Sequence, residues 1–228
     1  MKTEKLFDDW PERYDGWFQT PIGKRVIACE RAIVHELFRP APAETILDAG
    51  CGTGLFTLDF LTAGARVVGL ELSLPMLVAA CRRAASYPFG GIRGDMTGLP
   101  FSDACFDKVI SVTALEFIAD AQGAVDELFR VTRPGGCVLV ATLNRLSPWA
   151  ARRQAKTAKG QKHILEKAFF RSPEEIRALA PYQSETRTAV FFNKDDDPAE
   201  TEKIERDGRA AGLNTGAFVA TCWQKPQP

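Results

Sequence analysis

The sequence lacks the features that mark secreted, membrane and metal-binding proteins. Its six cysteines form no CxxC pair and no metal-ligand spacing, which favours small reduced core residues over disulfides and predicts no metal site. No apolar run approaches the ~18 residues of a membrane span, and the N-terminus has no apolar signal-peptide region. We therefore expect a cytoplasmic protein without integral membrane association.

Net charge and histidine are also missing or scarce. Lys and Arg together number 29, and so do Asp and Glu, so no overall field attracts nucleic acid. No nucleic-acid-binding module is appended. The two histidines are His35, inside a predicted helix, and His163, after a basic segment. Hydrophobic residues make up 45% of the 228 residues, which predicts an ordinary globular protein with a substantial core.

Strands and helices alternate along most of the chain. Apolar runs predict strands over 45–50, 65–71, 89–95, 106–112, 135–144, 184–193 and 216–225. Helical patterns separate the first five, over 54–64, 73–86 and 121–132. The predicted fold is a doubly wound, Rossmann-like α/β fold. It has a mostly parallel seven-stranded sheet, an antiparallel last strand and helices on both faces.

Two segments stand outside this alternation. Residues 1–20 carry a group of aromatic side chains that predicts a docking segment, namely Phe7, Trp10, Tyr14, Trp17 and Phe18. A helix of about 18 residues follows Thr20-Pro21. After the fifth strand comes a predicted helix with a basic face, made of Arg152, Arg153, Lys156, Lys159 and Lys162. We expect that face to be solvated, although it could also meet an anionic acceptor or a membrane surface.

A glycine-rich turn, GCGTG over 50–54, joins the first predicted strand to a helix. It lies where doubly wound sheets bind ligands, and glycine allows positive φ and close approach of a ligand. A dinucleotide fingerprint needs a third glycine where Leu55 stands, and Asp48 would repel a pyrophosphate but attract a cation. Glu71 ends the second strand and is suited to ribose hydroxyls. The turn predicts an adenosine-containing cofactor, used by either nicotinamide-dependent oxidoreductases or methyltransferases.

Four segments in order, LDAGCGTG, VVGLELS, GDMTGLPFSDACFDKVIS and RVTRPGGCVLVA, carry a resemblance. They resemble the motifs of class I S-adenosylmethionine-dependent methyltransferases, most closely the small-molecule branch with the ubiquinone and menaquinone methyltransferases. The similarity covers about residues 44 to 145. It implies in-line transfer of a methyl group from S-adenosylmethionine to a small-molecule acceptor, with S-adenosylhomocysteine as product.

The resemblance also implies a set of cofactor-binding residues. The methionine moiety would be held by Asp48, Gly50, Cys51 and Gly52, with Thr113 beside it and Tyr14 closing over it. Glu71 would bind the ribose. The adenine would contact Leu72, Asp95 and Met96. A nicotinamide-dependent oxidoreductase and a non-catalytic S-adenosylmethionine-binding protein are the alternatives. The acceptor and the oligomeric state are left open.

No catalytic residue follows from the sequence, because a general base is needed only when the acceptor must lose a proton. The weak candidates are Glu116, Tyr14 and His163, and Glu116 could equally be the solvent-facing start of a helix. We expect one domain over 1–228. Its parts are an N-terminal helical lid (1–40), the cofactor-binding core (44–145), a helical insertion (146–183) and C-terminal strands (184–228).

Overall fold

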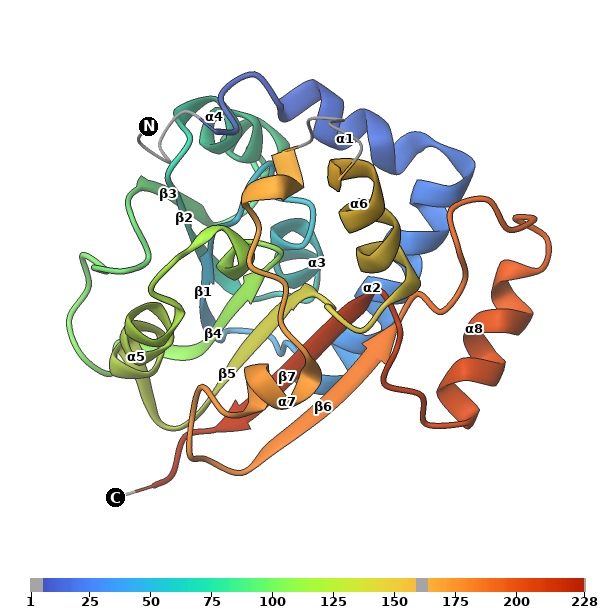
Figure 1. Cartoon of the computed structure of the whole chain (residues 1–228). Coiled ribbons are helices and arrows are strands. Elements are labelled where there is room, and N and C mark those ends of the chain that lie inside the picture. The colour runs from blue at the N-terminus through green and yellow to red at the C-terminus, as the bar shows by residue number, and fades with distance from the viewer. Residues whose placement is uncertain (1–5, 159–163, 228) are drawn as a thin grey trace.

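The fold is a central twisted sheet covered by helices, as Figure 1 shows. It is described by a computed structural model over residues 6–158 and 164–227. The strands are β1 (Thr45–Ala49), β2 (Arg66–Glu71), β3 (Phe89–Arg93), β4 (Phe106–Val112), β5 (Thr132–Leu143), β6 (Ser184–Ala189) and β7 (Phe218–Gln224). They lie in the order β3-β2-β1-β4-β5-β7-β6.

Only β7 runs against its neighbours. It pairs antiparallel with both β5 and β6, whereas β3, β2, β1, β4 and β5 pair in parallel. This confirms the predicted mostly parallel sheet with an antiparallel last strand. The chain order reverses between β1 and β4, and the crevice at such a switch point, at the carboxyl ends of the strands, is where these sheets bind ligands.

Helices cover both faces of the sheet, as predicted. One face carries α2 (Pro21–Phe38), α3 (Thr57–Thr62) and α4 (Leu74–Arg83), and the other carries α5 (Ala121–Val131) and α7 (Pro173–Arg177). At the end of the sheet where the parallel strands finish lie α1 (Pro11–Gln19), α6 (Pro148–Ala158) and the 3-10 turns η2 (Leu115–Phe117) and η3 (Ile164–Lys167). The helix α8 (Thr201–Ala210) packs outside β6.

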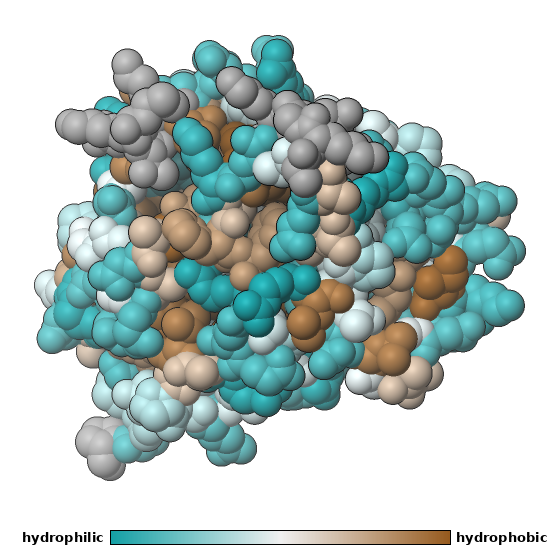
Figure 2. All heavy atoms as spheres, in the orientation of Figure 1, coloured by the Kyte–Doolittle hydropathy of each residue, from teal (hydrophilic) through white to brown (hydrophobic). Residues whose placement is uncertain are grey.

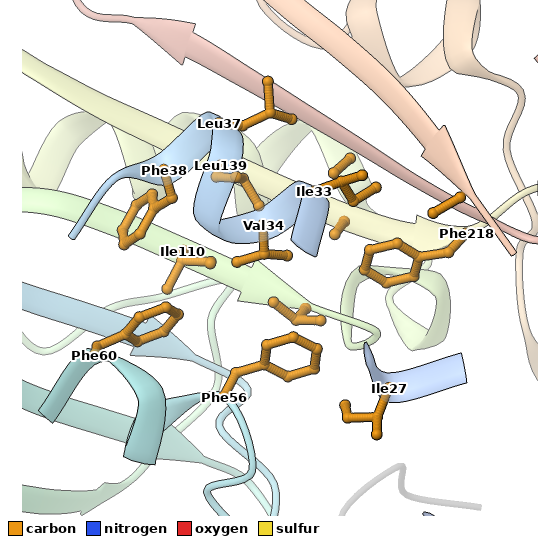
Figure 3. Close-up of a cluster of buried hydrophobic side chains, with 14 of the residues drawn as sticks. Ile27, Ile33, Val34, Leu37, Phe38, Phe56, Phe60, Ile110, Leu139 and Phe218 are labelled. Carbon is orange, nitrogen blue, oxygen red and sulfur yellow. The ribbon is translucent and has the colours of Figure 1, made fainter. Parts of the chain in front are cut away.

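The largest hydrophobic cluster lies between α2 and the sheet (Figure 3). Ile33 and Val34 of α2 are fully buried and point toward strand residues such as Ile110 and Leu139, which are also fully buried. Burying each such side chain contributes about 1.5–3 kcal/mol. The N-terminus of α2 is capped by Thr20, whose hydroxyl accepts the Gly23 N–H at 3.1 Å. This helix thereby ties the N-terminal segment to the core.

Two helices begin after a serine, and only one of these serines caps its helix through its side chain. Ser172 and Glu175 form a capping box at the start of α7. Ser73 precedes α4 but makes no cap with its side chain, because its hydroxyl donates to Asp8 at 2.8 Å instead. Ser73 therefore occupies the N-cap position of α4 without capping the helix through its side chain.

Two elements start elsewhere than predicted. The helix expected from Gly54 starts at Thr57, because Gly54 has a φ of 79° and belongs to the turn. The strand expected from residue 135 starts at Thr132, which pairs with Phe106 ahead of a register shift in β4. The shift accommodates additional residues of β5 between these two pairings, and the apolar pattern of the sequence does not reveal such an irregularity.

The cysteines are only partly the core residues that we expected. All six are free, and Cys51 and Cys137 are buried, but Cys81 on α4 is exposed. Among the described residues, no helix is both long and apolar enough to cross a membrane.

Candidate functional site at the carboxyl ends of the strands

The glycine-rich turn after β1 uses its own N–H groups within the protein. Gly50 and Gly52 have φ of 81° and 54°. The N–H groups of Gly50 and Cys51 both donate to the Leu70 carbonyl, at 2.7 and 3.1 Å, and that of Gly52 donates to Glu71 at 3.0 Å. A pyrophosphate cradle needs free N–H groups at such a turn. The turn geometry therefore disfavours a nicotinamide dinucleotide.

Asp48 lies in β1 just before the turn and is 2% exposed. Its Oδ2 accepts the Thr57 hydroxyl at 2.5 Å. Burial raises the pKa of Asp48 to about 7 despite that hydrogen bond, and the charge of Glu71 raises it further. A positively charged ligand group at Asp48 would offset the cost of burying its charge.

Glu71 ends β2 and joins that strand to the turn. Its two carboxylate oxygens accept the N–H groups of Gly52, at 3.0 Å, and of Ser73, at 2.8 Å. Burial raises its pKa, against these hydrogen bonds. A carboxylate has about four acceptor positions, so Glu71 retains capacity for two ligand hydroxyls. Leu72 follows and lines a cavity at the carboxyl ends of the strands, as Glu71 does.

Asp95 and Met96 follow β3. Asp95 is exposed, and its Oδ1 accepts both the N–H and the hydroxyl of Thr97 at 2.9 Å, which forms a local turn. Met96 is buried. The Asp95 carboxylate therefore has a structural partner as well as its place at the cavity.

Thr113 follows β4 in an unusual backbone conformation, with a φ of 49°. Such a conformation is unfavourable for a β-branched residue and is most often kept at functional positions. Its side chain lies close enough to the Tyr14 hydroxyl to affect the pKa of that group, which burial raises. This contact brings α1 to the end of β4.

All ten predicted binding residues line one cavity of about 320 Å³, which we call the first cavity. They are Tyr14, Asp48, Gly50, Cys51, Gly52, Glu71, Leu72, Asp95, Met96 and Thr113. The sequence did not point to its apolar lining, which includes Phe7, Leu55, Phe56, Met76, Phe117 and Ile118. Apolar side chains carry no functional signal in a sequence, because most of them serve the core.

A second cavity of about 1,020 Å³ adjoins the first. Phe7, Tyr14, Thr113 and Phe117 line both cavities, and the rings of Phe7 and Phe117 meet edge to face at 4.8 Å. All five aromatic side chains of the N-terminal segment line the second cavity, which confirms that this segment docks on the rest of the chain. On the face in Figure 2, apolar side chains gather between α5 and α6 with polar ones around them.

Glu116 lines the second cavity and is fully buried. The interpretation of Glu116 as the solvent-facing start of a helix is therefore wrong, because η2 turns it inward. Burial raises its pKa to about 7. Glu30 of α2, which the sequence did not single out, lines the same cavity, and burial together with the Glu116 charge raises its pKa to about 8.

The basic face expected on α6 is divided. Arg152 pairs with Asp195 at the surface, whereas Arg153 turns to the second cavity and lies over the rings of Trp149 and Phe170, 5.9 and 5.8 Å from their centroids. The expectation of a solvated face is wrong for Arg153, because the two rings provide a site for its guanidinium. The Lys156 side chain, Lys159, Lys162 and His163 lie outside the described residues.

The other histidine has a structural place. His35 on α2 is 41% exposed and lies 3.7 Å from the Asp59 carboxylate. It lines neither cavity. Within the described parts of the chain, no three His, Cys, Asp or Glu side chains are placed to hold a metal ion.

Polar contacts hold α1 over the glycine-rich turn. Asp15 accepts Arg83 Nη2 at 2.6 Å and the Thr53 hydroxyl at 2.7 Å. Arg83 also donates to the Thr53 hydroxyl at 2.9 Å. The segment that supplies Tyr14 is therefore fixed to both the turn and α4.

Comparison with known proteins agrees with this site. Residues 47–140 match the family model described as "Methyltransferase domain". A malonyl-[acyl-carrier protein] O-methyltransferase of Serratia marcescens is 35% identical over 149 residues, covering 65% of this chain and 57% of that protein. A demethylmenaquinone methyltransferase of Streptomyces avermitilis is 35% identical over 158 residues, covering 67% and 64%. The chain thus spans less than two thirds of the length of these relatives.

A solved structure shares the fold over nearly its whole length. It is a possible histamine N-methyltransferase of Thermotoga maritima, with a TM-score of 0.76 at 24% identity, covering 96% of this chain and 98% of that one. The family match falls on the segment whose motifs carry the resemblance noted in the sequence, and it includes the glycine-rich turn, Glu71 and Thr113. Residues 47–140 therefore match a methyltransferase domain, and the chain is similar in sequence to malonyl-[acyl-carrier protein] O-methyltransferases and demethylmenaquinone methyltransferases.

Proposed function

We propose that the protein transfers a methyl group from S-adenosylmethionine to a small-molecule acceptor. The observation that carries the proposal is the junction of two cavities at the switch point of the sheet, one carrying Asp48 and Glu71 and the other lined by aromatic side chains. The first cavity suits the cofactor and the second suits the acceptor. Tyr14 and Thr113 stand where the two meet.

The residues of the first cavity fit the chemical groups of the cofactor. The buried Asp48 suits its ammonium group, because a cation offsets the cost of burying the carboxylate. Glu71 suits the ribose hydroxyls, and Leu72, Asp95 and Met96 suit the adenine. Gly50, Cys51 and Gly52 would hold the methionine moiety, and Gly52 leaves room for it, since a Cβ there would enter open space.

The chain needs to align the two reactants and exclude water more than it needs to supply reacting groups. When bound, the cofactor supplies a methyl carbon activated by a positive sulfur. Orientation of two reactants can account for most of the rate of such a displacement. Tyr14, Phe7 and Phe117 would exclude water from the junction between the cavities. An anion close to the sulfonium would oppose the reaction, so the undissociated Tyr14 hydroxyl is suited to that place.

The segments outside the methyltransferase domain would form the lid. We propose that 1–40 closes over the cofactor and that the helical insertion 146–183 closes the acceptor cavity, both within one domain with the core 44–145 and the strands of 184–228. The cytoplasmic location and the absence of nucleic-acid partners stay predictions.

Binding and turnover together test the proposal. Calorimetry should show tight binding of S-adenosylhomocysteine and no binding of NADH or NADPH. Incubation with methyl-labelled S-adenosylmethionine and a metabolite pool should label a small molecule. Binding of NADH in place of S-adenosylhomocysteine would refute the proposal, and binding without any labelled product would leave a non-catalytic binding protein.

A further inference from the structure

The second cavity contains two buried carboxyl groups that the proposed cofactor site does not use. Glu30 comes from α2 and Glu116 from η2, and they are 5% and 0% exposed. Neither oxygen of Glu116 has a hydrogen-bond partner at normal geometry among the described residues, although the backbone N–H groups of Glu116 and Leu143 lie close enough to lower its pKa. A buried acceptor without a donor is unfavourable, so a ligand that brings N–H donors would gain by binding there.

The cations near these two carboxyl groups have other contacts as well. Arg153 faces both Glu30 and Glu116 from α6 and lies over two aromatic rings. Arg31, close to Glu30, pairs with Asp59 at 2.7 Å. Arg171, close to Glu116, donates to backbone carbonyls at 3.2 and 3.4 Å. Among the described lining residues, Arg153 is therefore the cation that faces both carboxyl groups, and Arg171 adds a positive charge near Glu116 from outside the lining.

The remaining charged side chains stand at the rim. Arg145 pairs with Glu175 at 3.0 Å and Arg152 with Asp195, each about half exposed. Arg13, Glu166 and Lys194 are exposed. Solvent screens such charges, so they influence an acceptor inside the cavity less than Glu30 and Glu116 do.

The walls of the cavity suit a cation attached to an apolar group. Trp10, which precedes α1, and Trp17 of α1 line it, together with Trp149 and Phe170 from the insertion. The faces of aromatic rings attract cations, and their area buries an apolar substituent. An anionic acceptor would instead lie against the two buried carboxyl groups.

We propose that the acceptor is an apolar primary or secondary amine, whose protonated nitrogen is held by Glu30 and Glu116 and which gives its proton to that pair before methylation. The proposal rests on the proposed methyl transfer. It extends that function by naming the class of the methyl acceptor and the groups that accept its proton.

The proton balance is consistent with the positions of these groups. Burial raises the pKa of Glu30 to about 8 and that of Glu116 to about 7, so near neutral pH the pair holds about one proton and can still accept another. The ammonium nitrogen loses a proton to a carboxylate, and its lone pair then forms the carbon–nitrogen bond as the carbon–sulfur bond breaks and leaves its electrons on sulfur. The products are a methylated ammonium ion, the neutral thioether and one proton released to water.

Calorimetry with S-adenosylhomocysteine already bound tests the acceptor class. The probes are phenethylamine and tryptamine, with 2-phenylethanol and 3-phenylpropionate as the neutral and anionic comparisons. We expect the amines to bind at least tenfold more tightly than both comparisons. Their affinity should rise from pH 6 to pH 8.5, because both carboxyl groups become ionised in that range while an alkylammonium, with a pKa of about 10, stays charged.

Isosteric variants give the matched comparison. Glu116→Gln and Glu30→Gln should each weaken amine binding at least tenfold and flatten its pH dependence, whereas Glu185→Gln, at an exposed position of β6, should change neither. Unaltered thermal unfolding and S-adenosylhomocysteine binding establish that a variant is folded. If only one of the two variants folds, that variant alone is enough to test the proposal. Tighter binding of 3-phenylpropionate, binding of neither amine, or amine binding unaffected by both variants would overturn the proposal. Loss of S-adenosylhomocysteine binding by the unmodified protein would instead overturn the proposed function.

Discussion

Alanine substitutions at two glycines of the turn distinguish the energetic cost of backbone strain from that of a steric clash. Gly50 and Gly52 both have positive φ, which costs an alanine about 1–2 kcal/mol. A Cβ on Gly50 would lie 2.4 Å from the Cβ of Ala114, whereas a Cβ on Gly52 would meet nothing within 4 Å. Overpacking adds roughly 1–3 kcal/mol at Gly50. We therefore expect Gly50→Ala to lower the free energy of unfolding by about 2–5 kcal/mol and Gly52→Ala by only ~1–2 kcal/mol.

Urea denaturation of the ligand-free variants measures this difference, and titration with S-adenosylhomocysteine measures a second one. The Cβ of Gly52→Ala would point into the open space of the first cavity, so this variant should lose affinity beyond its loss of stability, by about 1–3 kcal/mol. Equal losses of stability in the two variants would refute the steric part of the reasoning. Unchanged affinity in Gly52→Ala would refute the place given to the ligand.

Three further predictions concern other parts of the site and fold. The folded state keeps a proton on Asp48 up to about pH 7, whereas the unfolded state loses it near pH 4, so the stability of the ligand-free protein should fall as the pH rises from 4 to 7. Asp48→Asn should reduce the slope of stability against pH by up to one proton, measured by denaturation at several pH values, and an unchanged slope would contradict this. Asp15→Asn removes the partner of Arg83 and should weaken S-adenosylhomocysteine binding by roughly 1 kcal/mol in calorimetry, whereas Glu185→Gln serves as a control and should not. Ser172→Ala should lower the free energy of unfolding by about 1 kcal/mol through loss of the capping box, and a loss below ~0.3 kcal/mol would show that the cap contributes little.

The parts of the site that the sequence predicted are those set by local geometry. Asp48, Gly52 and Glu71 stand at the ends of adjacent parallel strands, so the order of strands and turns is enough to bring them together. The apolar runs likewise predicted the sheet, since consecutive residues such as Ile46 and Leu47 pack on its two opposite faces and both faces are buried.

The second cavity could not be predicted in the same way. Glu30 and Glu116 come from separate elements, and their proximity depends on how α2 and η2 pack against the sheet. The inward turn of Arg153 depends on where Trp149 and Phe170 lie. Helical periodicity reports which side of a helix is apolar, but it does not report which distant residue that side meets.

The position of β7 between β5 and β6 has a consequence for assembly of the protein. β6 leaves the ribosome before β7, yet its strand partner is β7. The nascent chain can therefore complete the wall that holds Asp48 and Glu71 while β6 still waits for a partner, because the lining of the first cavity ends at Asp120. The lining of the second cavity extends to Ala217, next to β7. Synthesis from the N-terminus thus allows the first cavity to form first, and the final strand then completes both the sheet and the second cavity.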